Sequence, residues 1–198
     1  MEAFEGFVAL ALEDEGFVVS PAVKFAVRLR TEKAAYEELQ THGYEVDLVA
    51  ARADRLILAT VKSFFGSRGV VSEHVTGETK DRRLRKLYAL LNDPTVRTEV
   101  VDSAAGRYGY PPDHVELRLY VGRFAAPQKG HHEAAIREWA AAQSVGAGPI
   151  GVFGLDEVVD RVRAVAAHKQ YRDNPVLVTM KVLDAAGLLT TSVPDGEV

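Results

Sequence analysis

The sequence contains no cysteine. This absence excludes disulfide bridges, thiol nucleophiles, iron–sulfur clusters and zinc sites built on thiolates. Any bound metal ion must therefore be held by oxygen or imidazole ligands. Long apolar runs are also absent, because the longest spans Phe7 to Leu12 and is far shorter than the roughly 20 residues that cross a bilayer. We expect a protein without a membrane partner.

Basic residues are missing where a secretory signal would carry them, since Glu2 and Glu5 occupy that region and no small-residue cleavage site follows. We therefore expect a cytoplasmic protein. The formal net charge of −4 argues against a surface that coats nucleic acid all round. It leaves room for a basic strip on one face.

The length of 198 residues and the 47% share of hydrophobic residues predict one folded domain with a sizeable core. We place this domain at residues 1–190. The acidic end of the chain predicts a flexible tail over residues 191–198.

Apolar periodicity and turn residues predict alternating helices and strands. This order is typical of an α/β protein with a mixed central sheet. Helices are expected over residues 2–15, 31–41, 84–91, 131–143, 155–168 and 175–186, with another starting at Pro94, and strands over 17–29, 45–52, 56–64, 115–121 and 149–153.

Two of these strands carry opposite charges near the middle of the sheet. Residues 53–55 have the length and composition of a hairpin connection, so the strand with Asp47 pairs with the strand that ends at Lys62. Alternation places Glu45 on the face of Asp47, and Thr60 on the face of Lys62. Buried charges are costly unless they pair or meet a metal, which makes this hairpin a candidate site.

The segments Tyr44-Glu45-Val46-Asp47-Leu48-Val49-Ala50 and Leu56-Ile57-Leu58-Ala59-Thr60-Val61-Lys62-Ser63 resemble the core of the PD-(D/E)xK nuclease superfamily. In that superfamily a hairpin carries an aspartate on one strand and a Glu-x-Lys motif on the next. An acidic residue in an N-terminal helix, here Glu5, also matches. The resemblance covers roughly residues 1–91 and implies a restriction-endonuclease-like, three-layer αβα domain.

The resemblance implies hydrolysis of phosphodiester bonds in DNA with Mg²⁺ or Mn²⁺. Asp47 would ligate the metal, with a further ligand from the Val61 carbonyl, and Lys62 would activate the attacking water. Thr60 stands where the family has glutamate or aspartate, so one carboxylate is missing. Acidic residues that could replace it are Glu73, as a further catalytic residue, Glu5 and Glu45, as metal ligands, and Glu78.

Two alternatives stay open. One is a catalytically inactive relative that serves as a nucleic-acid-binding or structural domain. The other is an unrelated α/β protein in which Asp47 and Lys62 form an exposed cross-strand ion pair, worth only about 0.2–1 kcal/mol. Dimers are frequent in the superfamily, so the resemblance also implies a homodimer.

A basic stretch follows the hairpin. On a helix its cations would lie opposite a buried stripe of Leu84, Leu87, Tyr88 and Leu91. Such a face could contact the phosphates of nucleic acid, or it could be a solvated helix surface. The candidate nucleic-acid-binding residues are Arg68, Lys80, Arg82, Arg83 and Lys86, with Arg85 in the same run.

Overall fold

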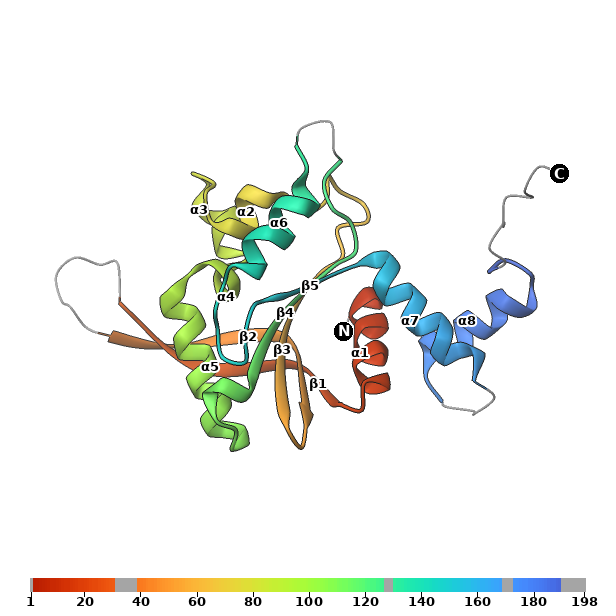
Figure 1. Ribbon diagram of the computed structural model, residues 1–198, viewed down its shortest axis with the longest axis horizontal. Helices are drawn as coiled ribbons and strands as arrows, with labels where there is room; N and C mark the ends of the chain where they lie inside the picture. Colours follow the sequence, from red (N-terminus) through yellow and green to blue (C-terminus); the bar gives the residue numbers. More distant parts are fainter. Residues whose placement is uncertain (1, 31–38, 127–129, 169–172, 190–198) are drawn as a thin grey trace.

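A computed structural model describes residues 2–30, 39–126, 130–168 and 173–189 (Figure 1). Five strands form one sheet in the order β1-β2-β3-β4-β5. The first three strands pair antiparallel, and β3, β4 and β5 pair parallel. The predicted α/β class with a mixed sheet is confirmed. The strands are β1 (Val18–Arg30), β2 (Leu39–Arg52), β3 (Arg55–Lys62), β4 (Val115–Val121) and β5 (Gly151–Gly154).

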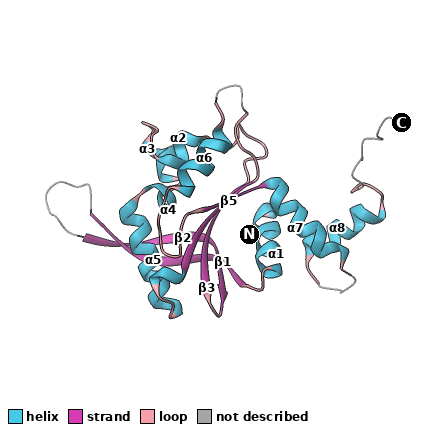
Figure 2. Cartoon of the chain, in the orientation of Figure 1, coloured by secondary structure: helices cyan, strands magenta, loops and turns pink. Residues whose placement is uncertain are grey.

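Helices cover both faces of this sheet, which gives the three-layer αβα arrangement that the resemblance implied (Figure 2). The helices are α1 (Ala3–Asp14), α2 (Ser72–Thr76), α3 (Arg82–Lys86), α4 (Ala89–Asn92), α5 (Pro94–Tyr108), α6 (His132–Ala141), α7 (Leu155–Ala167) and α8 (Pro175–Ala185). Helices α1 and α7 pack together on one face, and α8 packs outside them on α7 and α1.

Alternate residues of β3 divide the core between the two faces. Leu56 and Leu58 pack with residues of α2, α4, α5 and α6. Ile57 and Ala59 pack with α1 and α7. All four side chains are fully buried, as expected for a central strand that helices cover on both faces.

Two helices begin where an aspartate or asparagine precedes a proline, as the sequence predicts. The Asp93 carboxylate accepts hydrogen bonds from the backbone N–H groups of Thr95 and Val96, and Asn174 caps α8 in the same way. A proline at the first helical position costs nothing there, because its missing N–H would have no partner within the helix.

The predicted helix over residues 31–41 is wrong at its end. Residues 39–41 belong to β2, where Leu39, Gln40 and Thr41 pair with β1. Residues 31–38 lie outside the described residues, and so do residue 190, the last of the predicted domain, and the predicted flexible tail over 191–198. Pairing with β1 over a long antiparallel ladder outweighs the local helix propensity.

The predicted continuous helix through Leu84 and Leu91 is also wrong, because it breaks into α3 and α4. The Asn92 side chain donates hydrogen bonds to the carbonyl of Arg85, 3.1 Å away, and to that of His74, 3.0 Å away. The first of these bonds satisfies a carbonyl that a continuous helix would have used, and the second joins this segment to α2. Leu87, at the break, is 50% exposed and is not part of the buried stripe.

Within the described residues, no helix is both long enough and apolar enough to cross a membrane.

Burial of tyrosines makes the fold sensitive to alkali. Burial raises the pKa of Tyr44, of Tyr88 and of Tyr120, the last to about 12. The unfolded chain releases these protons near pH 10 whereas the folded chain retains them, so the free energy of unfolding should fall as the pH rises above 10. Each group contributes up to about 1.4 kcal/mol per pH unit.

Urea denaturation at pH 9 and at pH 11 measures this fall. The Tyr88→Phe variant should lose less stability between the two values than the unaltered chain, because its ring stays buried without an ionisable hydroxyl. An equal loss in both proteins would contradict the prediction.

Candidate functional site

The two charged residues of the hairpin converge at the end of β3. Lys62 Nζ lies 3.3 Å from Asp47 Oδ2, and the same oxygen accepts a 2.7 Å hydrogen bond from the backbone N–H of Val61. The Lys62 side chain is 19% exposed and that of Asp47 is 26% exposed. The pair is therefore mostly sheltered but open to solvent, unlike a surface ion pair on a fully solvated strand.

Asp47 lies where the pairing of β2 is interrupted on both sides. The pairing of β2 with β3 stops at Leu48, opposite Ala59, so the Val61 N–H has the Asp47 carboxylate as its partner. On the other side of β2, the pairs with β1 skip Asp47 and Ala22, and Ala22 has a φ of 52°. This left-handed conformation is costly for a residue with a Cβ atom, so the flanking pairs of the β1–β2 ladder must hold Ala22 in it, opposite Asp47.

Tyr44 lies near Asp47 and contacts helix α4. The backbone N–H of Leu90 donates a 3.0 Å hydrogen bond to the Tyr44 hydroxyl. Burial raises the pKa of Tyr44, and the nearby carboxylate of Asp47 adds to this effect. Tyr44 thus stays neutral at physiological pH and forms part of the wall beside Asp47.

Thr60 occupies the position where the resemblance expects an acid. It lies in β3 between Ala59 and Val61 and is only 6% exposed. Since the last pair of the ladder joins Leu48 to Ala59, the next position places Thr60 across from Asp47. The hydroxyl therefore stands at the right place for the missing carboxylate but carries no charge.

The candidate replacement acids do not gather around Asp47. Glu5 accepts a hydrogen bond from the Glu2 backbone N–H at the start of α1, 2.9 Å away. Glu45 is 3.6 Å from Lys24 Nζ on the exposed side of the hairpin. Glu73 and Glu78 are exposed, on α2 and just after it, and no hydrogen bond or ion pair between described residues links them to Asp47.

An acid that sequence reasoning missed lies closer to the end of β3. Glu2 Oε2 accepts a 3.2 Å hydrogen bond from Ser63 Oγ, and Ser63 follows Lys62 directly. This contact joins the start of α1 to the end of β3. No local pattern signals it, because the two residues are 61 positions apart.

The donors fit a divalent cation only in part. Among the described residues, no group of three or more histidine, aspartate or glutamate side chains is placed to hold a metal ion. Asp47 is the one carboxylate directly at the pair. Mg²⁺ is commonly bound by one or two carboxylates together with the phosphates of a substrate. The residues present therefore fit a cation that substrate helps to hold, and do not fit one held by this chain alone.

The cations of the basic stretch form an exposed cluster around α3. Lys80, Arg82, Arg83, Arg85 and Lys86 are exposed, and so is Arg68 in the loop after β3. Helix α3 packs on α2 and α4, and buried residues of these two helices belong to the same core cluster as Leu58 of β3. Alternation along β3 directs Lys62 toward this same face. The basic cluster and Lys62 therefore belong to one side of the sheet.

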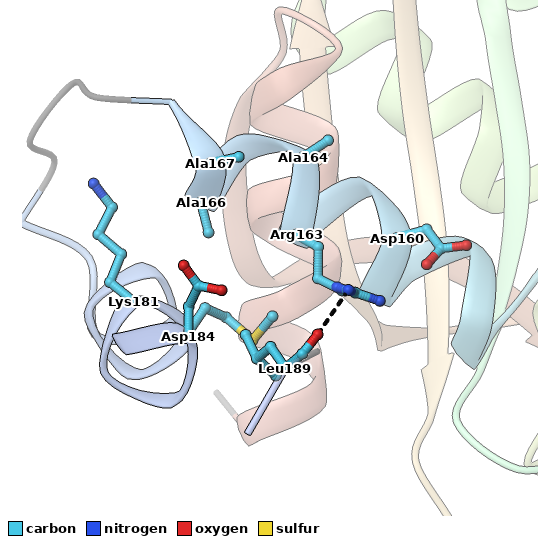
Figure 3. Close-up of a pocket in the computed structure, with 9 residues that line it drawn as sticks. Asp160, Arg163, Ala164, Ala166, Ala167, Lys181, Asp184 and Leu189 are labelled. Atoms are coloured by element: carbon cyan, nitrogen blue, oxygen red, sulfur yellow. Dashed lines mark hydrogen bonds between the residues drawn. The ribbon is translucent and has the colours of Figure 1, made fainter. Parts of the chain in front are cut away.

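A separate hollow of about 370 Å³ lies between α7 and α8 (Figure 3). Arg163 donates a hydrogen bond to the carbonyl of Leu189 across it, and Asp160, Lys181 and Asp184 line it as well. It shares no residue with the site around Asp47. Sequence reasoning predicted both helices but not this hollow, which depends on how α8 packs on α7.

Comparisons with known proteins leave the family open. No model of a protein family matches the chain, and no curated protein matches it. A solved crystal structure of a protein of unknown function, AF1548, is similar with 15% sequence identity and a TM-score of 0.42, over 93% of this chain and 77% of that one.

Proposed function

We propose that this chain binds nucleic acid, with Lys62 and the basic cluster around α3 directed at the phosphate backbone. The observation that carries the proposal is the placement of Lys62 and these exposed cations on the same side of the sheet. Between described residues, no ion pair engages Lys80, Arg83 or Lys86. Cations of this kind bind phosphates by releasing condensed counterions.

Salt-dependent binding is the direct test of this proposal. Fluorescence anisotropy with labelled single-stranded, duplex and branched DNA should show affinity that falls steeply between 50 and 300 mM NaCl, with EDTA present to prevent cleavage. Absence of binding to all three substrates at the lowest salt would overturn the proposal.

Hydrolysis of phosphodiester bonds is the second candidate function, and the convergence of Asp47 and Lys62 favours it. When bound, Mg²⁺ or Mn²⁺ would supply Lewis-acid activation of water and of the phosphate. Asp47 would be its carboxylate ligand, together with the substrate phosphate. Lys62 would offset the charge that develops on the scissile phosphate. Cleavage of the same three substrates in Mg²⁺ or Mn²⁺, compared with EDTA, tests this candidate.

The Asp47→Asn variant separates the two functions. Asparagine can still accept the hydrogen bond from the Val61 N–H, whereas alanine would leave that donor unpaired at a cost of about 1–3 kcal/mol. Loss of the carboxylate charge breaks the ion pair with Lys62, so the Lys62 ammonium can bind a DNA phosphate instead. We therefore expect DNA binding in EDTA to tighten, by about 2- to 10-fold at low salt. Cleavage, if the chain cleaves, should fall at least about 100-fold.

Lys62→Met is the matched control, because it removes the other member of the pair. It should weaken binding as well as cleavage. If Asp47→Asn and Lys62→Met change binding in the same direction, the pair does not face the phosphate. If both variants cleave like the unaltered chain, the hydrolytic site lies elsewhere.

A further inference from the structure

The turn that follows Lys62 holds one aromatic ring at the surface. Phe65 is 50% exposed, although it lies only three residues after the site. Phe64 before it has a φ of 46°, in the left-handed region that residues with a Cβ atom seldom adopt. The backbone N–H of Ser67 closes the turn on the Phe64 carbonyl at 3.2 Å.

This strained conformation gives the two phenylalanines different environments. The Phe64 side chain packs against the core cluster that contains Leu56 and Leu58 of β3. Phe65 points the other way and meets Phe4 of α1 edge to face, with ring centroids 5.5 Å apart. Backbone strain of this kind is kept only where the surrounding structure enforces it. The turn thus keeps Phe64 in a strained conformation, and the Phe65 ring stays partly exposed to water.

The Phe65 ring also lies close to the backbone of Gly122. A Cβ atom at Gly122 would lie 2.8 Å from the Phe65 ring and 2.5 Å from the Ser63 carbonyl, so only glycine allows this approach. Phe65 is therefore packed by Phe4 and by the backbone of Gly122, and keeps its position without a ligand.

Two exposed arginines lie in the turn or contact its backbone. Arg123 Nη1 donates to the Phe65 carbonyl at 3.5 Å, and both Arg123 and Arg68 are exposed. Lys62 begins the same segment. A packed aromatic ring with exposed arginines nearby in the same loop region suits single-stranded nucleic acid, because phosphates can meet the cations while an unpaired base stacks on the ring. The bases of an intact duplex are stacked on one another and cannot reach such a ring.

We propose that Phe65 is a stacking platform for an unpaired base, so that the preferred ligand is a single strand or an unpaired end. This inference rests on the proposed function and narrows it to one class of nucleic acid. A stacked base is worth enough that removal of the ring should weaken binding by about 10-fold or more.

The test compares a labelled dT oligonucleotide with a blunt duplex in EDTA. The unaltered chain should bind the single strand more tightly than the duplex. Phe65→Ala should weaken the single strand about 10-fold and leave the duplex within about 2-fold. Leu87→Ala is the matched control, since Leu87 is equally exposed and lies beside the basic cluster, and it should change neither affinity by more than about 2-fold.

A second variant keeps the test valid if Phe65→Ala does not fold. Phe65→Trp in a Trp139→Phe background places the single tryptophan of the chain at the platform. Addition of dT should quench its fluorescence, and addition of duplex should not.

Each outcome decides between the two proposals. Binding of duplex and single strand with equal affinity, or equal weakening of both by Phe65→Ala, overturns the stacking platform and leaves the proposed function standing. If the chain binds neither the single strand nor the duplex, the stacking platform and the proposed function are both overturned.

Discussion

Replacement of Lys80, Arg83 and Lys86 by glutamine is expected to weaken nucleic-acid binding by about 100-fold at low salt. Arg83 and Lys86 lie in α3 and Lys80 lies just before it, and all three are exposed. No ion pair between described residues engages any of them. With duplex DNA as the ligand, each phosphate contact contributes about 0.9 to the slope of log affinity against log salt. The slope should therefore become less steep by about 2.7 in the triple variant.

Glutamine preserves the helix, because it is a good helix former of similar length. The cap of α3 is untouched, since the Asp81 carboxylate accepts from backbone N–H groups. The Asn92 side chain, which joins α3 to α2 through the backbone carbonyls of Arg85 and His74, is also untouched. The variant should thus unfold at the same urea concentration as the unaltered chain.

A triple variant elsewhere controls for net charge. Arg55→Gln, Arg161→Gln and Lys181→Gln remove the same charge from β3, α7 and α8, away from the basic cluster. Anisotropy titrations from 50 to 300 mM NaCl give the slope for each protein. Equal slopes in the two triple variants would mean that the cluster around α3 is only a solvated helix surface.

Local patterns in the sequence were sufficient for most of the elements. The hairpin at Ala53 and Asp54, and the caps at Asp93 and Asn174, depend on residues within a few positions of one another. Alternation of side chains along a strand likewise placed Asp47 and Lys62 near each other, and the structure brings them to 3.3 Å. Such features depend on the backbone geometry of a few neighbouring residues, so a short stretch of sequence is enough to predict them.

The errors arose where distant contacts outweigh local preference. Helix formers fill residues 31–41, yet residues 39–41 pair with β1 in the antiparallel ladder. Similarly, the helical spacing of Leu84 and Leu87 did not reveal that Asn92 binds the end of α3. Competition of this kind is decided by tertiary packing, which periodicity does not contain.

In the candidate site too, local features could be predicted from the sequence, whereas contacts between distant residues could not. Thr60 was recognised as a departure from the family pattern, but the fate of the nearby acids could not be inferred from spacing. Glu5 and Glu45 are engaged by a helix start and by Lys24. Glu2 and Phe65 were missed because their partners Ser63 and Phe4 lie 61 residues away in the chain. Contacts across such distances appear only once α1 is packed on the sheet.

Arg118 is a further residue that the sequence left unnoticed, and its removal should cause the largest loss of stability. It lies in β4 on the face covered by α1, and its side chain is 9% exposed. Its guanidinium donates to Glu116 at 2.6 Å, to Glu15 at 2.9 Å and to the Tyr120 hydroxyl at 3.2 Å. Burial disfavours the charged form, but the hydrogen bonds to Glu116 and Tyr120 outweigh it and raise the pKa of Arg118.

Arg118→Met keeps the length of the side chain but removes the charge. Glu15 at the end of α1 then loses the guanidinium that ties this helix to the sheet, and the Tyr120 hydroxyl loses a donor. Breaking a buried ion pair costs about 3–5 kcal/mol, and the partial exposure of both glutamates brings our expectation to about 3 kcal/mol. Urea denaturation should show this as a lower free energy of unfolding.

Arg55→Met is the matched control for Arg118→Met, because Arg55 pairs with the same Glu116 at 3.0 Å but is 44% exposed. An exposed pair contributes about 0.2–1 kcal/mol, so the control should unfold almost like the unaltered chain. A similar loss in both variants would show that burial of Arg118 adds nothing to the pair. A large loss in Arg118→Met alone would establish that Arg118 anchors α1, and with it Glu2 and Phe4, against the sheet beside the candidate site.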